Sequence, residues 1–256
     1  MASRPRAENL KSAGEGPGED KRRLPRRGVG LALILGATLC LSTCGLDVVT
    51  YYQAPAFTYA GYAITLTHNT ANTASTFLGY NIYYHAYQTQ TLADTARQTI
   101  ESAISSSSST PQSVLASMTN QGFVEIYNAS TPTVSPTPLC SVSSSAATTA
   151  VNFNFLMDNT SIATNWYYTA STDSSSTHHY VVRALPTVVA PYNSFNYTYQ
   201  TSDSDYASTN NAVTAGGIVY LVFFAVAYGY DISTLSSIYS FPTSLWQSIA
   251  YTLPSS

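Results

Sequence analysis

Residues 217–228, with the sequence GIVYLVFFAVAY, are almost continuously apolar. This stretch is too short for a membrane helix, which needs about 20 apolar residues. Its β-branched and aromatic side chains favour a strand, and an unbroken apolar pattern is typical of a strand inside a layered fold. The sequence therefore predicts a central strand that is covered on both faces, or whose outer face meets another layer.

Shorter runs rich in Tyr, Val, Ile, Phe and Thr recur through the chain after residue 56, separated by clusters of Ser, Thr, Asn, Gly and Pro. This arrangement is typical of an all-β sandwich or barrel. The predicted strands are residues 57–67, 77–87, 122–127, 151–156, 165–170, 179–185, 194–199, 217–228, 238–243 and 247–252.

Two segments depart from the strand pattern. Residues 92–104 (LADTARQTIESAI) carry apolar side chains at intervals of four residues, which predicts one face of a helix. Residues 111–118 are a weaker helical candidate, because Pro111 suits the first turn of a helix. The serine run at 105–109 between them is predicted to be a loop.

Parts of the predicted β region resemble a fibronectin type III domain. Residues 63–68 (AITLTH) and 77–84 (FLGYNIYY) resemble its strands B and C, and residues 219–229 followed by 238–242 (IYSFP) resemble strand F, its turn and strand G. The resemblance implies a mainly β fold, an immunoglobulin/fibronectin type III-like antiparallel β-sandwich. It implies no activity, because this architecture carries many functions.

The sequence also departs from that family. His68 stands where the family has a tryptophan, and the phase of the F-like strand leaves open whether Tyr220 is the corner tyrosine of the family. Residues 88–216 separate the C-like and F-like parts and exceed what the family needs. We therefore expect one elaborated sandwich domain at 57–256, with a large insertion at roughly 88–216 that carries one or two short helices.

The N-terminal region has a different composition from the rest of the chain. Eight of the ten Lys and Arg residues precede position 28, and residues 29–41 (VGLALILGATLCL) are apolar. A basic segment followed by an apolar run of this length is typical of a secretory signal. An uncleaved N-terminal anchor is the alternative, although the run is short for spanning a bilayer.

Residues 41–44 (Leu-Ser-Thr-Cys) resemble a bacterial lipobox, and the residues that follow resemble spirochaete-type lipoproteins. This resemblance implies a signal peptide at 1–43, lipidation of Cys44, and a tether at 44–56. It also implies export and anchoring to a bacterial membrane, at the outer membrane or cell surface rather than the inner membrane. Ordinary signal cleavage that leaves Cys44 as a free thiol is the alternative.

The chain after Cys44 carries two cations, Arg97 and Arg183, against nine acids, which gives a net charge of −7. So few cations cannot neutralise a run of phosphates, which excludes nucleic-acid binding and electrostatic adhesion to an anionic membrane surface. All 21 tyrosines also lie in this part of the chain. This aromatic content excludes disorder and predicts a folded domain.

Few residues point to chemistry. His178 and His179 are adjacent near Asp173, but neighbouring side chains on a strand point to opposite faces and cannot chelate one metal together. Asp203 and Asp205 lack the Gly and Glu of a calcium loop. Cys140 has no charged neighbour and is predicted to be a buried apolar residue. We therefore predict no catalytic residue, metal site or cofactor.

Two functional hypotheses follow. In the first, the protein is a non-catalytic envelope module that binds a protein or glycan, or is structural, and it presents an exposed aromatic patch. In the second, it is an envelope hydrolase or metal-dependent enzyme on the same scaffold. The second requires a pocket that gathers at least two of His178, His179, Asp173, Asp203, Asp205 and Glu125.

Overall fold

The computed structural model describes residues 51–130, 137–157, 166–174, 177–184, 192–193, 217–232 and 234–253. These residues belong to one compact unit that is mainly β, and every strand pair in it is antiparallel. The strands are β1 (Ala56–Ala60), β2 (Ala63–Thr67), β3 (Phe77–Tyr87), β4 (Val124–Asn128), β5 (Cys140–Ser141), β6 (Asn152–Leu156), β7 (Tyr167–Ala170), β8 (His179–Ala184), β9 (Tyr192–Asn193), β10 (Ile218–Asp231), β11 (Ser236–Tyr239), β12 (Thr243–Ser244) and β13 (Ile249–Thr252); the helices are α2 (Gln90–Ile104) and α3 (Pro111–Asn120).

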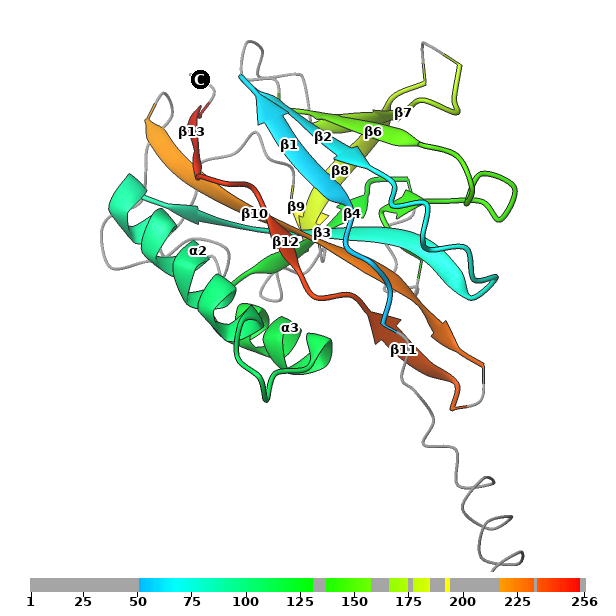
Figure 1. Ribbon diagram of the computed structural model, residues 1–256. Coiled ribbons are helices and arrows are strands. Elements are labelled where there is room, and N and C mark those ends of the chain that lie inside the picture. Colours follow the sequence, from blue (N-terminus) through cyan, green and yellow to red (C-terminus); the bar gives the residue numbers. More distant parts are fainter. Residues whose placement is uncertain are drawn as a thin grey trace, which may run out of the picture. The chain divides into compact units, whose positions relative to one another are not determined.

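The strands form one curled sheet in the order β1-β2-β6-β7-β8-β4-β3-β10-β11. Strands β1, β2 and β6 lie across β3 and β10, so that two parts of the same sheet face each other (Figure 1). The inner faces enclose the main core, which includes Ile64 of β2, Phe155 of β6 and Phe223 of β10. Full burial of such a side chain contributes roughly 1.5–3 kcal/mol to stability.

Trp166, just before β7, lies at the centre of this core and is 1% exposed. Its ring packs edge-on against Tyr84, Phe155 and Tyr251, at centroid distances of 6.0, 5.9 and 5.2 Å. Its indole N–H donates a hydrogen bond to the Tyr251 hydroxyl at 3.0 Å, which satisfies the one polar group of the side chain. Trp166 therefore joins strands that are far apart in the sequence.

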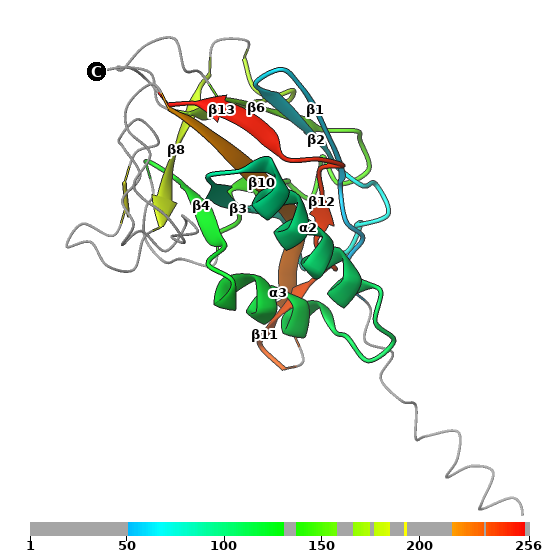
Figure 2. The same ribbon diagram turned by 90° about the vertical axis from the view of Figure 1, so that its left-hand side faces the viewer.

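Helices α2 and α3 cover the outer face of β3 and β10 (Figure 2). Val222, Phe224 and Val226 of β10 point toward the helices, whereas Leu221 and Phe223 point into the main core. The prediction that residues 217–228 form a central strand covered on both faces is thus confirmed. Tyr220 packs with the helix-facing set, so it does not lie in the main core.

Both predicted helices are confirmed, and local capping explains where they begin. The Thr89 side chain accepts a hydrogen bond from the backbone N–H of Leu92 at the start of α2. Thr110 and Ser113 form a reciprocal capping box at the start of α3, with Pro111 in its first turn. These caps satisfy backbone N–H groups that have no partner within the helix.

The prediction of a single strand at 57–67 is wrong, because the chain turns back at Gly61 and Tyr62 to form the β1–β2 hairpin. Gly61 has φ of +60°, a left-handed conformation that glycine adopts at little cost. The predicted strand at 238–243 is also divided, because Pro242 has no N–H to donate and lies between β11 and β12. The predicted strand at 194–199 lies outside the described residues.

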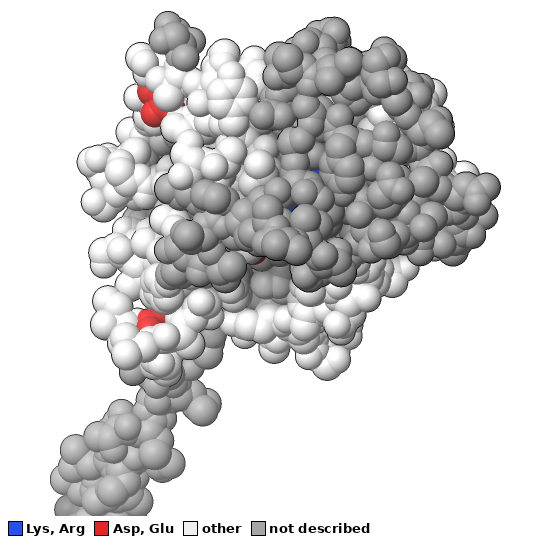
Figure 3. Space-filling model, turned by 180° about the vertical axis from the view of Figure 1, so that it is seen from behind, with Lys and Arg blue, Asp and Glu red and all other residues white. Residues whose placement is uncertain are grey.

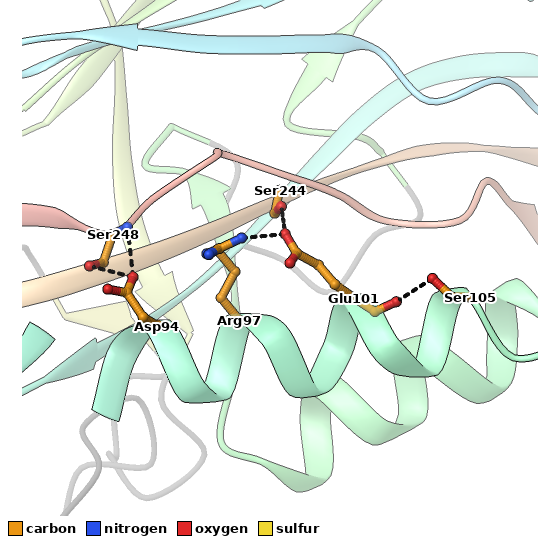
Figure 4. Close-up of polar contacts among 6 residues, drawn as sticks. All are labelled: Asp94, Arg97, Glu101, Ser105, Ser244 and Ser248. Carbon is orange, nitrogen blue, oxygen red and sulfur yellow. Dashed lines mark hydrogen bonds and ion pairs between the residues drawn. The ribbon is translucent and has the colours of Figure 1, made fainter. Parts of the chain in front are cut away.

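Strands β11, β12 and β13 pair in turn with successive parts of β10, so they act as one interrupted strand along its outer edge. Side chains of α2 hold this segment in place (Figure 4). Asp94 accepts hydrogen bonds from the Ser248 backbone N–H at 3.4 Å and from its hydroxyl at 3.1 Å. Glu101 accepts from the Ser244 hydroxyl and from Arg97, each at 2.6 Å. The charged face of α2 is therefore tied to the C-terminal strands.

A buried polar cluster surrounds the hydroxyl of Tyr80, which is fully buried in β3. This hydroxyl accepts a hydrogen bond from the Asn69 backbone N–H at 2.9 Å and lies 2.7 Å from Nδ1 of His68. Nε2 of His68 lies 2.9 Å from the backbone carbonyl of Ala147, which can only accept. His68 Nε2 is therefore the donor, and Nδ1 accepts from the Tyr80 hydroxyl.

The same cluster clamps the point where the chain enters the domain. Asn72 accepts from the backbone N–H of Gln53 at 2.7 Å and donates to its carbonyl at 2.8 Å. Asn69 donates to the backbone carbonyl of Ala54 at 3.1 Å. Residues 53 and 54 are thus fixed by side chains of the segment that follows β2.

Candidate functional site

A hollow of about 300 Å³ lies beside the turn between β7 and β8. Its apolar lining includes Leu139, Phe153 and Tyr168, which come from three separate segments of the chain. All three side chains are also part of the main core, which holds them in place. We call this apolar part of the lining the floor of the hollow. The volume is at the lower end of the range for small-molecule sites, which is about 300–1,000 Å³.

The polar lining of the hollow centres on a hydrogen bond between the β7–β8 turn and the start of β8. Nε2 of His179 lies 2.7 Å from Oδ2 of Asp173, and each side chain is about 30% exposed (30% and 29%). The imidazole ring stacks on Tyr168 at a centroid distance of 4.6 Å and an interplanar angle of 13°. The carboxylate and the aromatic ring together fix the orientation of His179.

Tyr168 links this pair to the floor. Its hydroxyl donates a hydrogen bond of 2.7 Å to the backbone carbonyl of Leu139. Burial raises the pKa of Tyr168 above its usual range, with a smaller contribution from Cys140. The phenol therefore stays neutral at ordinary pH and keeps its donor role.

One hollow gathers two of the six candidate residues, Asp173 and His179, which is the minimum that the enzyme hypothesis requires. His178 points to the other face of β8 and stacks on Tyr167 at 4.2 Å, as strand alternation predicts. Asp203 and Asp205 lie outside the described residues, as does Cys44. Within the described ranges, no group of three or more His, Cys, Asp or Glu residues could hold a metal ion.

Glu125 of β4 occupies a different environment. Its Oε2 accepts hydrogen bonds from the hydroxyls of Tyr83 at 3.2 Å and Tyr127 at 3.1 Å. Burial raises the pKa of this carboxyl to about 7, and the two hydrogen bonds act in the opposite direction. Cys140 is a fully buried free thiol whose pKa is raised by burial, which confirms the prediction of an unreactive apolar residue.

Glu125 is expected to make the stability of the domain fall as pH rises. The folded protein keeps this proton up to about pH 7, whereas the unfolded chain loses it near pH 4.5. Between these values the folded state binds more protons, so the free energy of unfolding should decrease by about 3 kcal/mol through this group. Urea denaturation from pH 4.5 to 8, compared with Glu125→Gln, measures this contribution; equal slopes for both proteins would contradict it.

Exposed aromatic side chains gather where β1 meets the C-terminal strands. Trp246 is 69% exposed and stacks on Tyr59 of β1 at 5.9 Å. Gln247 donates a hydrogen bond to the Tyr59 hydroxyl, and the exposed ring of Tyr62 packs edge-on against Tyr251. The binding-module hypothesis predicts an exposed aromatic patch, but its residues were not predicted, because the sequence does not reveal that the first and last strands of the domain adjoin.

The described surface carries little charge. Seen from behind, it is almost entirely uncharged, with acidic atoms near one edge (Figure 3). Of the two cations that follow Cys44, Arg97 forms an ion pair with Glu101, and Arg183 is fully buried. Among the described helices, none has the length and apolar content that crossing a bilayer requires.

Comparison of the chain with protein-family models, with curated proteins and with solved structures returned no significant match.

Proposed function

We propose that this chain is a lipid-anchored, non-catalytic protein of the bacterial cell envelope, whose folded part is a fibronectin type III-like module that binds an uncharged glycan. The anchor is Cys44, exposed as the first residue when residues 1–43 are removed. This anchor is proposed because a basic segment, an apolar run and the sequence Leu-Ser-Thr-Cys follow one another in that order.

The strand pairing supports the fibronectin-like part of the proposal. The C-like strand β3 pairs with the F-like strand β10, and β10 pairs with the G-like strand β11, as in the C-F-G sheet of the immunoglobulin architecture. The B-like strand β2 lies in the facing part of the sheet, between β1 and β6. Strand β6 would then take the place of strand E, since it pairs with β2, and the elaborations would be helices α2 and α3 and the other strands from β4 to β9.

The observation that carries the ligand proposal is the lining of the hollow. Hydroxyl and amide side chains surround its apolar floor: Asn128, Thr137, Ser141 and Thr172. Asp173 and His179 add an acceptor and a ring donor, and none of the lining residues is Lys or Arg. Hydroxyl-rich uncharged rings suit such a lining, whereas an anion would find no Lys or Arg side chain to pair with.

Replacement of Cys44 by alanine is expected to release the protein from the membrane fraction. A lipoprotein cysteine carries several acyl chains, and each buried methylene contributes about 0.8 kcal/mol, so the acylated protein should remain bound through repeated washing. Intact-mass analysis of membrane-extracted protein checks this. The wild type should begin at Cys44 with added acyl mass, and a mature chain without that mass would contradict the anchor.

Replacement of Asp173 by asparagine is expected to weaken saccharide binding at least tenfold, because the orientation of His179 depends on that carboxylate. Titration of the full chain with a panel of neutral mono- and disaccharides, followed by NMR, measures the affinity. Asp231→Asn is the matched control, since Asp231 lies at the end of β10 and does not line the hollow. Failure of every neutral saccharide to bind, or equal weakening in both variants, would contradict the ligand proposal.

A further inference from the structure

The turn between β10 and β11 carries the two most exposed large hydrophobic side chains in the described part of the chain. Ile232 is 70% exposed and Leu235 is 83% exposed. The last pair of the hairpin is Asp231 with Ser236, so both side chains lie beyond the end of the sheet. We call Ile232 and Leu235 the apolar tip.

The backbone conformation at Leu235, in the apolar tip, is unfavourable for a leucine. Leu235 has φ of +53°, in the left-handed region where glycine or asparagine is favoured. The turn is braced by hydrogen bonds from Thr234 to Asp231 at 2.9 Å and between Thr234 and Ser236 at 2.6 Å. Leucine gains almost no packing at this position, so the stability of the domain alone does not account for it.

The first described residues, Tyr51 and Tyr52, pack at this same end of the domain. The hydroxyl of Tyr52 donates to Thr76 at 2.8 Å and lies 3.5 Å from the carbonyl oxygen of Tyr230, two residues before Ile232. The ring of Tyr51 lies 6.2 Å from that of Phe241. In Figure 1 the first described residues lie beside β11.

The short tether keeps the tip close to the bilayer. Residues 45–50 separate Cys44 from Tyr51. At about 3.3–3.6 Å per residue, this segment and its two ends span at most about 25 Å. A tether of this length gives the tip a high effective concentration at the lipid surface, so a weak contact suffices to hold it there.

We propose that Ile232 and Leu235 insert into the same bilayer that holds Cys44 and act as a second, apolar contact with it. This inference rests on the proposed lipid anchor. The tip contacts the acyl chains of the lipid rather than anionic headgroups, because the turn carries Asp231 and the chain after Cys44 has a net charge of −7. Docking would set the orientation of the whole domain, since β10 runs from the tip toward the opposite end of the sheet.

The test uses full-length acylated protein in phosphatidylcholine vesicles that contain brominated lipid, with a small thiol-reactive fluorophore attached at position 236 through the substitution Ser236→Cys. Labelling is specific because Cys140 is fully buried and Cys44 is acylated. The label is compared in the wild-type tip and in the Ile232→Ser/Leu235→Ser background, so that the probe stays constant while the tip changes. A second label, attached through Ala60→Cys, reports on the exposed β1–β2 turn.

We expect lipid quenching of the label at position 236 to be at least threefold stronger with the wild-type tip than with the serine tip, and the label at position 60 to be unaffected by the tip. Intact mass of the same sample separates the two proposals. Protein without acyl mass would contradict the anchor. Acylated protein with equal quenching for both tips, each measured relative to the same protein in vesicles without brominated lipid, would overturn the inference alone.

Discussion

Replacement of Trp166 by alanine is expected to lower the free energy of unfolding by about 3–5 kcal/mol. The side chain is 1% exposed and packs against rings from β3, β6 and β13. Removal leaves a cavity among Tyr84, Phe155 and Tyr251, and it takes away the donor that satisfies the Tyr251 hydroxyl. Both effects destabilise the folded state, because close-packed rings on separate strands cannot all move to fill the space.

The chain provides its own control for this prediction. Its other tryptophan, Trp246, is 69% exposed, so Trp246→Ala should change the free energy of unfolding by less than about 1 kcal/mol. Urea denaturation followed by circular dichroism measures both variants without depending on tryptophan fluorescence. Trp166→Phe should be intermediate, since it keeps an aromatic ring but loses the indole N–H. Equal effects at 166 and 246 would contradict the packing described for the core.

Replacement of Tyr80 by phenylalanine is expected to cost about 2–4 kcal/mol, although it removes a single oxygen atom. That oxygen accepts from the Asn69 backbone N–H and the Asn72 amide, and it donates to His68. Without it, three polar groups lose a hydrogen-bond partner, and each buried group left unsatisfied costs about 1–3 kcal/mol. Ring packing against Phe77 is retained, so the loss reports on hydrogen bonding alone.

The matched control is Tyr62→Phe, in which the same atom is removed from a tyrosine that is 39% exposed. This change should have an effect within about 0.5 kcal/mol. Thermal and urea denaturation of the three proteins under identical conditions compare them. A Tyr80→Phe protein as stable as Tyr62→Phe would show that water replaces the missing hydroxyl.

Patterns confined to one segment predicted much of the fold. The run rich in aromatic residues at 77–87 predicted β3 with its observed bounds, and the unbroken apolar run at 217–228 predicted a strand with layers on both sides. The spacing of apolar residues at 92–104 predicted α2. These signals are visible in the sequence because they arise from the local geometry of one strand or one helix.

Features that depend on pairing between distant segments could not be predicted. Gly61 turns the chain inside a run that is rich in strand-forming residues on both sides, so the composition predicted one strand where the structure has a hairpin. Asp173 and His179 were both candidates, but the floor beneath them comes from residues 139 and 153, which join it only through the sheet order. The hydrogen-bond partners of Tyr80 and the neighbours of Trp246 were missed for the same reason, because other segments of the chain supply them.

The clamp on residues 53 and 54 determines how the domain withstands mechanical force. A pull on the N-terminal end, directed along β1, loads the Tyr52–Thr76 hydrogen bond and then the hydrogen bonds from Asn69 and Asn72. Behind them, the five residue pairs between β1 and β2 are loaded in shear and share the force, rather than opening one after another. Because resistance to forced unfolding depends on the unfolding rate, this geometry favours a domain that stays folded while its N-terminal end is pulled.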